Sequence, residues 1–281
     1  MSAKLNHYAA GIDCGSAFCK GALLKGALYS NADGGGNFAG AGTGITIEKL
    51  FTLPSGWNVR ETSAKVLDML FAALPAGTPP PAVVATGYGR EQVEGRGKTI
   101  TEISAHAAGA EFLCPGARTL VDIGGQDCKV ITIEAGRVLE FQMNDKCAAG
   151  SGRFLETVAA RLGANAGQAE DLLALGKSAV LNSTCVVFAE SEITALIARG
   201  VSREAILGGV ADAMAARIAA MAARLSINEP AVLSGGLSGS AGIARALSRT
   251  LGITVRTLEN GAYSGAMGAA LAGLWEGKNA G

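Results

Sequence analysis

Short apolar runs alternate with amphipathic stretches along this chain of 281 residues. Apolar runs of about 4–8 residues bounded by Gly, Pro or Asp are typical of buried strands, whereas apolar residues spaced three and four apart indicate helices. In the first part of the chain, this pattern predicts strands at 8–13, 18–24, 45–53 and 82–86, and helices at 61–74 and 101–113.

The order then restarts in the second part of the chain. Strands are predicted at 119–123, 128–133, 138–143, 231–233 and 253–257, and helices at 151–162, 186–199 and 203–225, with further helices between and after the last two strands. The same order, strand hairpins followed by helices, occurs in both parts of the chain. It predicts an α/β protein of two similar domains. We place these domains at residues 1–116 and 117–281.

A short internal repeat supports the duplication. Residues 13–20 read D-C-G-S-A-F-C-K and residues 122–129 read D-I-G-G-Q-D-C-K, so both carry Asp, then Gly two positions later, then Cys-Lys. Each copy follows an apolar strand and opens a hairpin. A duplicated fold with one phosphate loop in each half and nucleotide between the halves accounts for this repeat. Two ordinary turns in a chain with 40 glycines are the alternative.

The repeat supplies candidate residues for binding a magnesium nucleotide. Glycine turns bring backbone N–H groups close to phosphate oxygens, and Asp13 or Asp122 at a strand end can hold Mg²⁺ through water. Ser16 and Lys20 are candidate phosphate contacts, although a solvated strand end also explains Lys20. Gln126 is predicted to orient an attacking water, because phosphoryl transfer depends on positioning and charge neutralisation.

A third glycine element follows the predicted strand at 231–233 and precedes a helix. Its glycines, Gly235 and Gly236, allow the close backbone approach that would seat adenine and ribose. A plain strand-to-helix connection is the alternative for this element.

Charge and hydropathy limit the classes of partner. Lys plus Arg and Asp plus Glu are 24 each, which argues against a nucleic-acid binder that works through a basic face. The longest apolar stretch, residues 208–227, is interrupted by Asp212, Arg217 and Arg224. These charged side chains would be costly to bury in the hydrocarbon core of a membrane. No signal-peptide pattern opens the sequence. We therefore expect a soluble cytoplasmic protein that binds neither nucleic acid nor membrane.

Two of the six cysteines stand before predicted helices, and no CxxC pair is present. Cys147 and Cys185 would gain thiolate stability from the helix N-terminus. Two cysteines per chain cannot complete the four-thiolate shell of an iron–sulfur cluster, whereas two chains related by a two-fold axis can. From these residues alone, two buried thiols are the simpler interpretation.

The segments around these cysteines resemble a known family. Residues 143–156 (M-N-D-K-C-A-A-G-S-G-R-F-L-E) and 183–192 (S-T-C-V-V-F-A-E-S-E) look like the activators of 2-hydroxyacyl-CoA dehydratases, or archerases, of the wider BadF/BadG/BcrA/BcrD ATPase family. The resemblance covers nearly the whole chain. It includes G-I-D-C-G-S at 11–16, A-T-G-Y-G-R at 85–90, D-I-G-G-Q-D at 122–127, S-G-G at 234–236 and G-A-M-G-A-A-L at 265–271.

This resemblance implies an actin/Hsp70/sugar-kinase-like fold with Mg²⁺ and ATP or ADP in the cleft between the domains. It also implies one [4Fe–4S] cluster per homodimer, held by Cys147 and Cys185 of both subunits. ATP hydrolysis would drive a low-potential electron from ferredoxin or flavodoxin onto a partner iron–sulfur enzyme, either a dehydratase, a benzoyl-CoA reductase or a double-cubane reductase. The family's phosphate contacts map onto Gly15, Ser16, Lys20, Gly124, Gly125 and Gln126.

The chain also departs from the family pattern. Cys14 and Cys19 stand where Val and Ser or Thr are expected, and the glycine-rich insertion at 26–44 is longer than usual. Together with Cys114 and Cys128, these two cysteines are interpreted as buried or partly buried thiols. The stretch 262–264 replaces a more polar one, so no adenosine contact is carried over there.

Two further hypotheses remain at this stage. A small-molecule kinase of the same fold would need a catalytic Asp for a substrate hydroxyl and would have no use for Cys147 or Cys185. A non-catalytic actin-like assembly protein would need extended surfaces for self-association. His106, on an Ala-rich helical stretch, is interpreted as a structural residue rather than a base.

Overall fold

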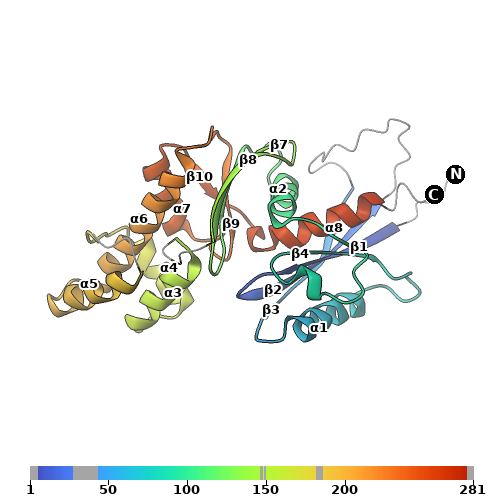
Figure 1. The fold of residues 1–281 in the computed structure, drawn as a ribbon, viewed down its shortest axis with the longest axis horizontal. Helices are drawn as coiled ribbons and strands as arrows, with labels where there is room; N and C mark the ends of the chain where they lie inside the picture. The colour runs from blue at the N-terminus through green and yellow to red at the C-terminus, as the bar shows by residue number, and fades with distance from the viewer. Residues whose placement is uncertain (1–5, 28–43, 146–147, 149, 182–185, 277–281) are drawn as a thin grey trace. The chain divides into compact units, whose positions relative to one another are not determined.

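The computed structural model describes residues 6–27, 44–145, 148, 150–181 and 186–276. The chain divides into two compact units (Figure 1): Met1–Ala117, Ile133–Val138 and Asn260–Gly281 make up the first, and Arg118–Thr132 with Leu139–Glu259 the second. The boundary at Ala117 lies next to the predicted one. The last helix, which the sequence placed in the second domain, belongs to the first unit.

The sheet of the first unit has the strand order β3-β2-β1-β4-β5. The antiparallel strands β1 (Asn6–Cys14), β2 (Phe18–Ala27) and β3 (Thr46–Pro54) form a meander. β4 (Ala82–Thr86) runs parallel to β1, and the two-residue β5 (Lys98–Thr99), which the pattern did not predict, runs parallel to β4.

Helices cover both faces of this sheet (Figure 1). α1 (Val59–Ala72) buries Val66 and Leu70 on one face, and α2 (Glu102–Leu113) and α8 (Ser264–Glu276) lie on the other. Small residues let α8 approach closely, because a Cβ added at Gly11 would lie 1.9 Å from the Ala266 carbonyl oxygen.

The sheet of the second unit repeats the same topology. Its order is β10-β9-β6-β7-β8, in which β6 takes the place of β1, and β9 that of β4. β6 (Thr119–Ile123) pairs antiparallel with β7 (Cys128–Glu134) and parallel with β9 (Ala231–Gly235). The remaining strands are β8 (Arg137–Asn144) and β10 (Val255–Thr257). The predicted duplicated α/β architecture is therefore confirmed.

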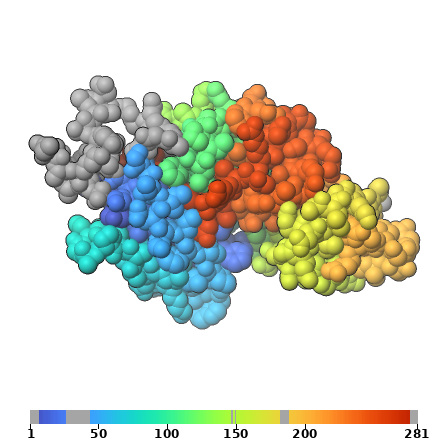
Figure 2. All heavy atoms as spheres, turned by 180° about the vertical axis from the view of Figure 1, so that it is seen from behind, coloured from blue at the N-terminus to red at the C-terminus, as the bar shows by residue number. Residues whose placement is uncertain are grey.

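The second unit holds α3 (Gly152–Arg161), α4 (Ala166–Ala174), α5 (Val186–Ala198), α6 (Arg203–Ala222) and α7 (Ala241–Leu251). Figure 2 shows α4 and α5, coloured yellow to gold, together on the surface of this unit. Among the described residues, α6 is the one helix long and apolar enough to cross a membrane, and 56% of its apolar window is buried. Because Ile206, Val210 and Met214 lie in the core, α6 has the character of a core helix.

The pattern missed α4, although its start carries a readable signal. Asn165 accepts a hydrogen bond from the Gln168 backbone N–H, and the Gln168 side chain accepts one from the Asn165 N–H, both at 3.0 Å. This reciprocal capping box starts a helix even where the apolar period is short. Most of the predicted insertion, residues 28–43, lies outside the described residues.

Candidate functional site

Each sheet carries an aspartate near the end of its first strand, directly opposite a lysine. Asp13 of β1 is paired with Lys20 of β2, and Asp122 of β6 is paired with Lys129 of β7. The register is thus the same in both units, in agreement with the internal repeat.

A tight turn connects the paired strands in each unit. We call residues 15–18 the first turn and residues 124–127 the second turn. The Gly15 N–H donates to the Phe18 carbonyl and the Gly124 N–H to the Asp127 carbonyl, both at 3.0 Å. A Cβ at Gly124 would lie 2.1 Å from Asp127 Oδ1, so a side chain does not fit at that position.

A neighbouring parallel strand brings a hydroxyl residue beside each aspartate. Thr86 of β4 lies beside Asp13, and Ser234 of β9 lies beside Asp122. The Ser234 hydroxyl donates to Asp122 Oδ1 at 2.7 Å, whereas the Thr86 hydroxyl donates to the Ile100 carbonyl at 3.1 Å. The hydroxyl therefore orients the carboxylate in the second unit only.

A glycine with positive φ follows each hydroxyl residue, with φ +85° at Gly87 and +80° at Gly235. A Cβ would lie 2.6 Å from Asp13 Oδ1 at Gly87 and 2.9 Å from Asp122 Oδ1 at Gly235. Glycine is therefore needed at both positions for backbone conformation and for space. Gly236, in contrast, borders open space, because a Cβ there would meet nothing within 4 Å.

Lys129 is the largest fully buried side chain among the described residues, at 1% exposure. Its Nζ lies 3.1 Å from Asp122 Oδ2 and 2.7 Å from Asp127 Oδ2. A lysine is rarely buried so completely unless it is paired. Lys129 thus ties the strand end before the second turn to the last residue of that turn.

The corresponding aspartate of the first unit has a different neighbour. His106 of α2 is buried, and its Nε2 lies 3.8 Å from Asp13 Oδ2 and 4.0 Å from Glu102 Oε1. A Cβ at Gly265 of α8 would lie 2.5 Å from Asp13 Oδ2. The sequence assigned His106 a structural role, and the structure places it beside a predicted site residue that is distant in the chain.

The remaining predicted residues of the turns are accessible. Ser16 and Gln126 are exposed, and Gly15, Gly125 and Lys20 are half-buried. Both turns thus expose polar residues to solvent, whereas the aspartates before them are buried.

The second turn is hydrogen-bonded to the start of α3. The Gly152 N–H donates to the Gly124 carbonyl at 2.8 Å, and the Arg153 N–H donates to the Gly125 carbonyl at 3.1 Å. The first N–H groups of a helix have no partner within the helix, and here the turn supplies it. Gly152 suits this contact, because a Cβ there would already lie 3.3 Å from the Gly124 oxygen.

The predicted cluster ligands, Cys147 and Cys185, lie outside the described residues. The helices that follow them in sequence, α3 and α5, contact each other. Arg161 of α3 lies 3.1 Å from Glu190 Oε1 and donates to the Thr194 hydroxyl at 2.7 Å, and both partners belong to α5.

The other four cysteines are free thiols, as predicted. Cys14 and Cys19 have their Sγ atoms 3.2 Å apart, and this contact together with burial raises the pKa of Cys14 well above its ordinary value. Burial raises the pKa of Cys128 to about 11. Both groups are therefore neutral thiols at pH 7.

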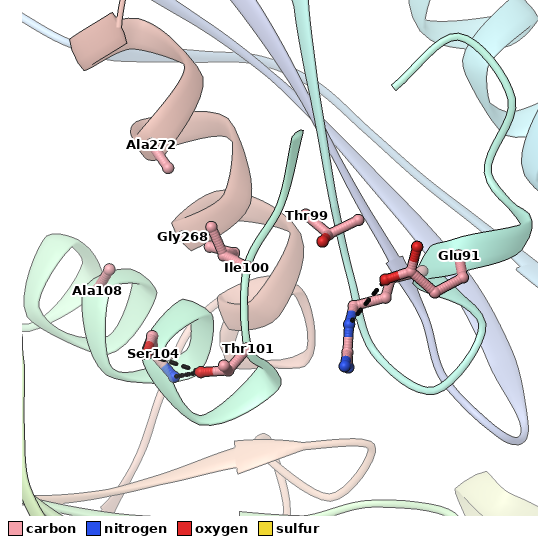
Figure 3. A pocket seen from close by; sticks show the side chains of 9 residues that line it. Glu91, Thr99, Ile100, Thr101, Ser104, Ala108, Gly268 and Ala272 are labelled. Atoms are coloured by element: carbon pink, nitrogen blue, oxygen red, sulfur yellow. Dashed lines mark hydrogen bonds and ion pairs between the residues drawn. The ribbon is translucent and has the colours of Figure 1, made fainter. Parts of the chain in front are cut away.

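A separate pocket of about 440 Å³ lies in the first unit, between the start of α2 and α8 (Figure 3). Two of its hydroxyl residues are engaged in capping, because Thr101 accepts a hydrogen bond from the Ser104 N–H at 3.2 Å. None of the predicted site residues lines this pocket.

Two sheets of equal strand order, each with a buried aspartate and a glycine turn at its first hairpin, define the actin/Hsp70/sugar-kinase fold. A solved protein of this kind, the ethanolamine utilization protein EutJ from Carboxydothermus hydrogenoformans, is similar at a TM-score of 0.55 and 18% identity, over 94% of this chain and 89% of that one. This likeness concerns the fold alone.

The family model described as the BadF/BadG/BcrA/BcrD ATPase family matches residues 10–273, and the chain belongs to this family. It is therefore an ATPase. Protein YjiL of Escherichia coli K12 is 41% identical over 224 residues, which cover 79% of this chain and 80% of YjiL.

Two solved structures match nearly the whole chain. The activator of 2-hydroxyisocaproyl-CoA dehydratase from Clostridium difficile, with bound ADPNP, has a TM-score of 0.82 and 32% identity, over 97% of this chain and 96% of that one. Component A of the (R)-2-hydroxyglutaryl-CoA dehydratase from Acidaminococcus fermentans has a TM-score of 0.81 and 33% identity, over 97% and 99% of the two chains.

Proposed function

We propose that this ATPase is a homodimeric activator that couples ATP hydrolysis to electron transfer onto a partner iron–sulfur enzyme. The two solved relatives bear the names of a dehydratase activator and a dehydratase component. The observation that carries the coupling is the pair of hydrogen bonds from α3 to the second turn. They join a predicted phosphate loop to the helix that follows Cys147.

The nucleotide is proposed to bind with its phosphates at the glycine turns. Gly15, Ser16 and Lys20 contact it from the first turn and its flanking strand, and Gly124 and Gly125 contact it from the second turn. The N–H groups of Gly15 and Gly124 donate within their own turns, so a phosphate would bind the N–H groups that follow them, those of Ser16, Gly125 and Gln126. Gly236, where a Cβ would meet nothing within 4 Å, is proposed to lie against the adenosine together with Gly235.

The two aspartates are proposed to hold Mg²⁺ through its bound water, and the ion would neutralise charge on the transferred phosphate. Asp122 is oriented for this by Lys129 and Ser234. Gln126, exposed in the second turn, orients the attacking water.

The peptide groups of the second turn explain how a phosphate can affect α3. A trans peptide carries its C=O and N–H on opposite sides. Because the carbonyls of Gly124 and Gly125 accept from α3, the N–H groups of Gly125 and Gln126 in the same two peptides point away from α3. An anion bound to these N–H groups polarises both peptides and strengthens the bonds to α3.

The cluster is proposed to be shared by two subunits, with Cys147 and Cys185 of each as ligands. Thiolate sulfur is the usual cluster ligand, and α3 and α5 are held together by Arg161, which fits two ligand segments that serve one site. A bound [4Fe–4S] cluster would supply one-electron redox chemistry at low potential. The electron donor is proposed to be ferredoxin or flavodoxin.

Iron content tests the shared cluster directly. Protein purified anaerobically is expected to be brown and to contain about two iron atoms per chain, because a four-iron cluster would be divided between two chains. Iron analysis with light scattering measures this ratio. Four iron atoms per chain in a monomer would contradict the shared cluster, and a colourless iron-free ATPase would favour the small-molecule kinase.

Hydrogen exchange tests the link from the second turn to α3. The Gly152 and Arg153 amides are expected to exchange several-fold more slowly with Mg–ADPNP than with Mg–ADP, because the γ-phosphate strengthens their acceptors. Iron extraction by a chelator is expected to be faster with Mg–ADPNP, because the nucleotide alters the segments that carry the cluster. Equal exchange and equal extraction in the two states, with binding of both nucleotides verified, would refute the coupling.

A further inference from the structure

Two buried thiols face each other across the first turn. Cys14 ends β1, Cys19 lies directly opposite in β2, and their Sγ atoms are 3.2 Å apart. Both side chains are fully buried. At the same register in the second unit, Ile123 stands opposite Cys128. The equivalent pair in the second unit therefore contains one thiol, whereas the pair in the first unit contains two.

The backbone geometry of this pair suits a disulfide. The Gly15 N–H donates to the Phe18 carbonyl, which makes these two residues a hydrogen-bonded pair of the antiparallel ladder. The next pair, Cys14 and Cys19, is then a non-hydrogen-bonded pair, whose Cα atoms are about 4.5 Å apart. This separation lies inside the range of about 4.4–6.8 Å found for disulfides. The sulfur atoms need to approach by roughly 1 Å to reach a bond length of about 2.05 Å.

We infer that Cys14 and Cys19 form an oxidation site, at which a peroxide converts the two thiols into an intrachain disulfide. One cysteine loses its proton when the turn opens to water and attacks the peroxide as a thiolate. The O–O bond breaks, a sulfenic acid forms, and the departing hydroxide takes up the released proton as water. The second thiol then displaces the sulfenic oxygen as a second water, and the S–S bond closes. The two thiols lose two electrons and two protons, and the peroxide is reduced to water. A thiol reductant reverses the step by exchange.

The disulfide closes a ring around a predicted phosphate turn. On its other side, Cys14 is held by the segment after β4, because its carbonyl accepts from the Gly89 N–H at 2.9 Å. Drawing its sulfur toward Cys19 therefore shifts either the first turn or the strand end at Asp13. This consequence rests on the proposed function: the oxidised protein is expected to hydrolyse ATP several-fold more slowly than the reduced protein.

Because both thiols are buried, their oxidation depends on opening of the first turn. A peroxide reaches the sulfur atoms when the turn opens, and its residues Ser16 and Phe18 are already exposed. A nucleotide bound against the turn keeps it closed. Oxidation is therefore expected to be several-fold slower in the presence of Mg–ADPNP.

Peptide mapping of the full-length protein tests the inference. Anaerobically purified protein is treated with hydrogen peroxide, alkylated under denaturing conditions and digested with trypsin. The tryptic peptide 5–20 contains Cys14 and Cys19 and no other cysteine. We expect its doubly alkylated form to be replaced by a non-alkylated form about 2 Da lighter than the reduced peptide, because two hydrogens are lost. Dithiothreitol is expected to restore the doubly alkylated form.

The peptide 119–129 is the matched control, because its single cysteine, Cys128, is equally buried at the equivalent register. It is expected to remain alkylated. The variants Cys14→Val and Cys19→Ser are expected to lose the lighter form of their peptide, and either variant alone suffices for this comparison. The inference is overturned if peptide 5–20 stays doubly alkylated while Cys114 is oxidised, or if its two cysteines become sulfinic acids without a disulfide.

ATP hydrolysis is measured on the same samples. In the wild type, peroxide is expected to reduce ATP hydrolysis and dithiothreitol to restore it. If Cys14→Val shows no such loss, the result supports the inference that the disulfide slows hydrolysis through the first turn. A disulfide that leaves hydrolysis unchanged overturns that effect. A reduced protein that never hydrolyses ATP contradicts the proposed function instead, and the mapping result still stands.

Discussion

Lys129→Met is expected to lower the free energy of unfolding by about 3–5 kcal/mol, which is typical when one partner of a buried ion pair is removed. The substitution leaves the carboxylates of Asp122 and Asp127 buried beside an apolar side chain. Lys129 lies within 3.1 Å of one and 2.7 Å of the other, at 1% exposure. Urea denaturation of the nucleotide-free protein measures the change. We also expect weaker ATP hydrolysis, because the second turn loses its anchor.

Lys177→Met is a matched control for this prediction. Lys177 lies 2.9 Å from Glu204, but its side chain is 61% exposed, so the loss is expected to stay below about 1 kcal/mol. Adding Asp127→Asn to Lys129→Met is expected to recover part of the stability, because one buried charge is removed. Equal losses in Lys129→Met and Lys177→Met would show that the buried pair contributes no more than a surface contact.

Replacing a predicted cluster ligand is expected to abolish the cluster completely. Cys147→Ser or Cys185→Ser would leave two of four thiolates in the dimer, and serine is a poor substitute for a thiolate. Iron is therefore expected to fall from about two atoms per chain to nearly none. Visible absorption and iron analysis of anaerobically purified protein measure the loss.

Cys114→Ser serves as the control, because Cys114 is a half-buried thiol at the end of α2 and precedes no helix. It is expected to keep both iron and colour. A colourless Cys114→Ser protein, alongside a brown Cys185→Ser protein, would mean that the ligands were assigned to the wrong cysteines.

The sequence was informative wherever one element carried its own signal. The repeat of Asp, Gly and Cys-Lys predicted two hairpins in the same register, and the pairs Asp13–Lys20 and Asp122–Lys129 confirm it. The strands around these turns are short, apolar and bounded by glycine. The hydrophobic pattern and the glycine positions therefore predict the same strand boundaries. The candidate roles of Asp13 and Asp122 remain predictions, because no ligand tests them.

The sequence could not predict what depends on tertiary packing. A lysine in a strand is usually solvated, and nothing local shows that Lys129 is buried between two carboxylates. His106 lies far from Asp13 in the chain, and folding alone brings them together. The sequence of α8 is apolar, which predicts burial but not the sheet against which the helix packs. Close contacts such as that of Gly11 with Ala266 determine the sheet.

The assignment of α8 to the first unit has a consequence for synthesis on the ribosome. One face of the first sheet, which includes Ala9, Ala22 and Leu24, is covered by α8, and α8 emerges only after the whole second unit. At about 5–20 residues per second, that face stays without α8 for on the order of ten seconds or more. The second unit is contiguous apart from a short excursion, and it can complete its core first. The apolar face of the nascent first sheet is thus expected to be open to aggregation, or to a chaperone, until α8 is synthesised.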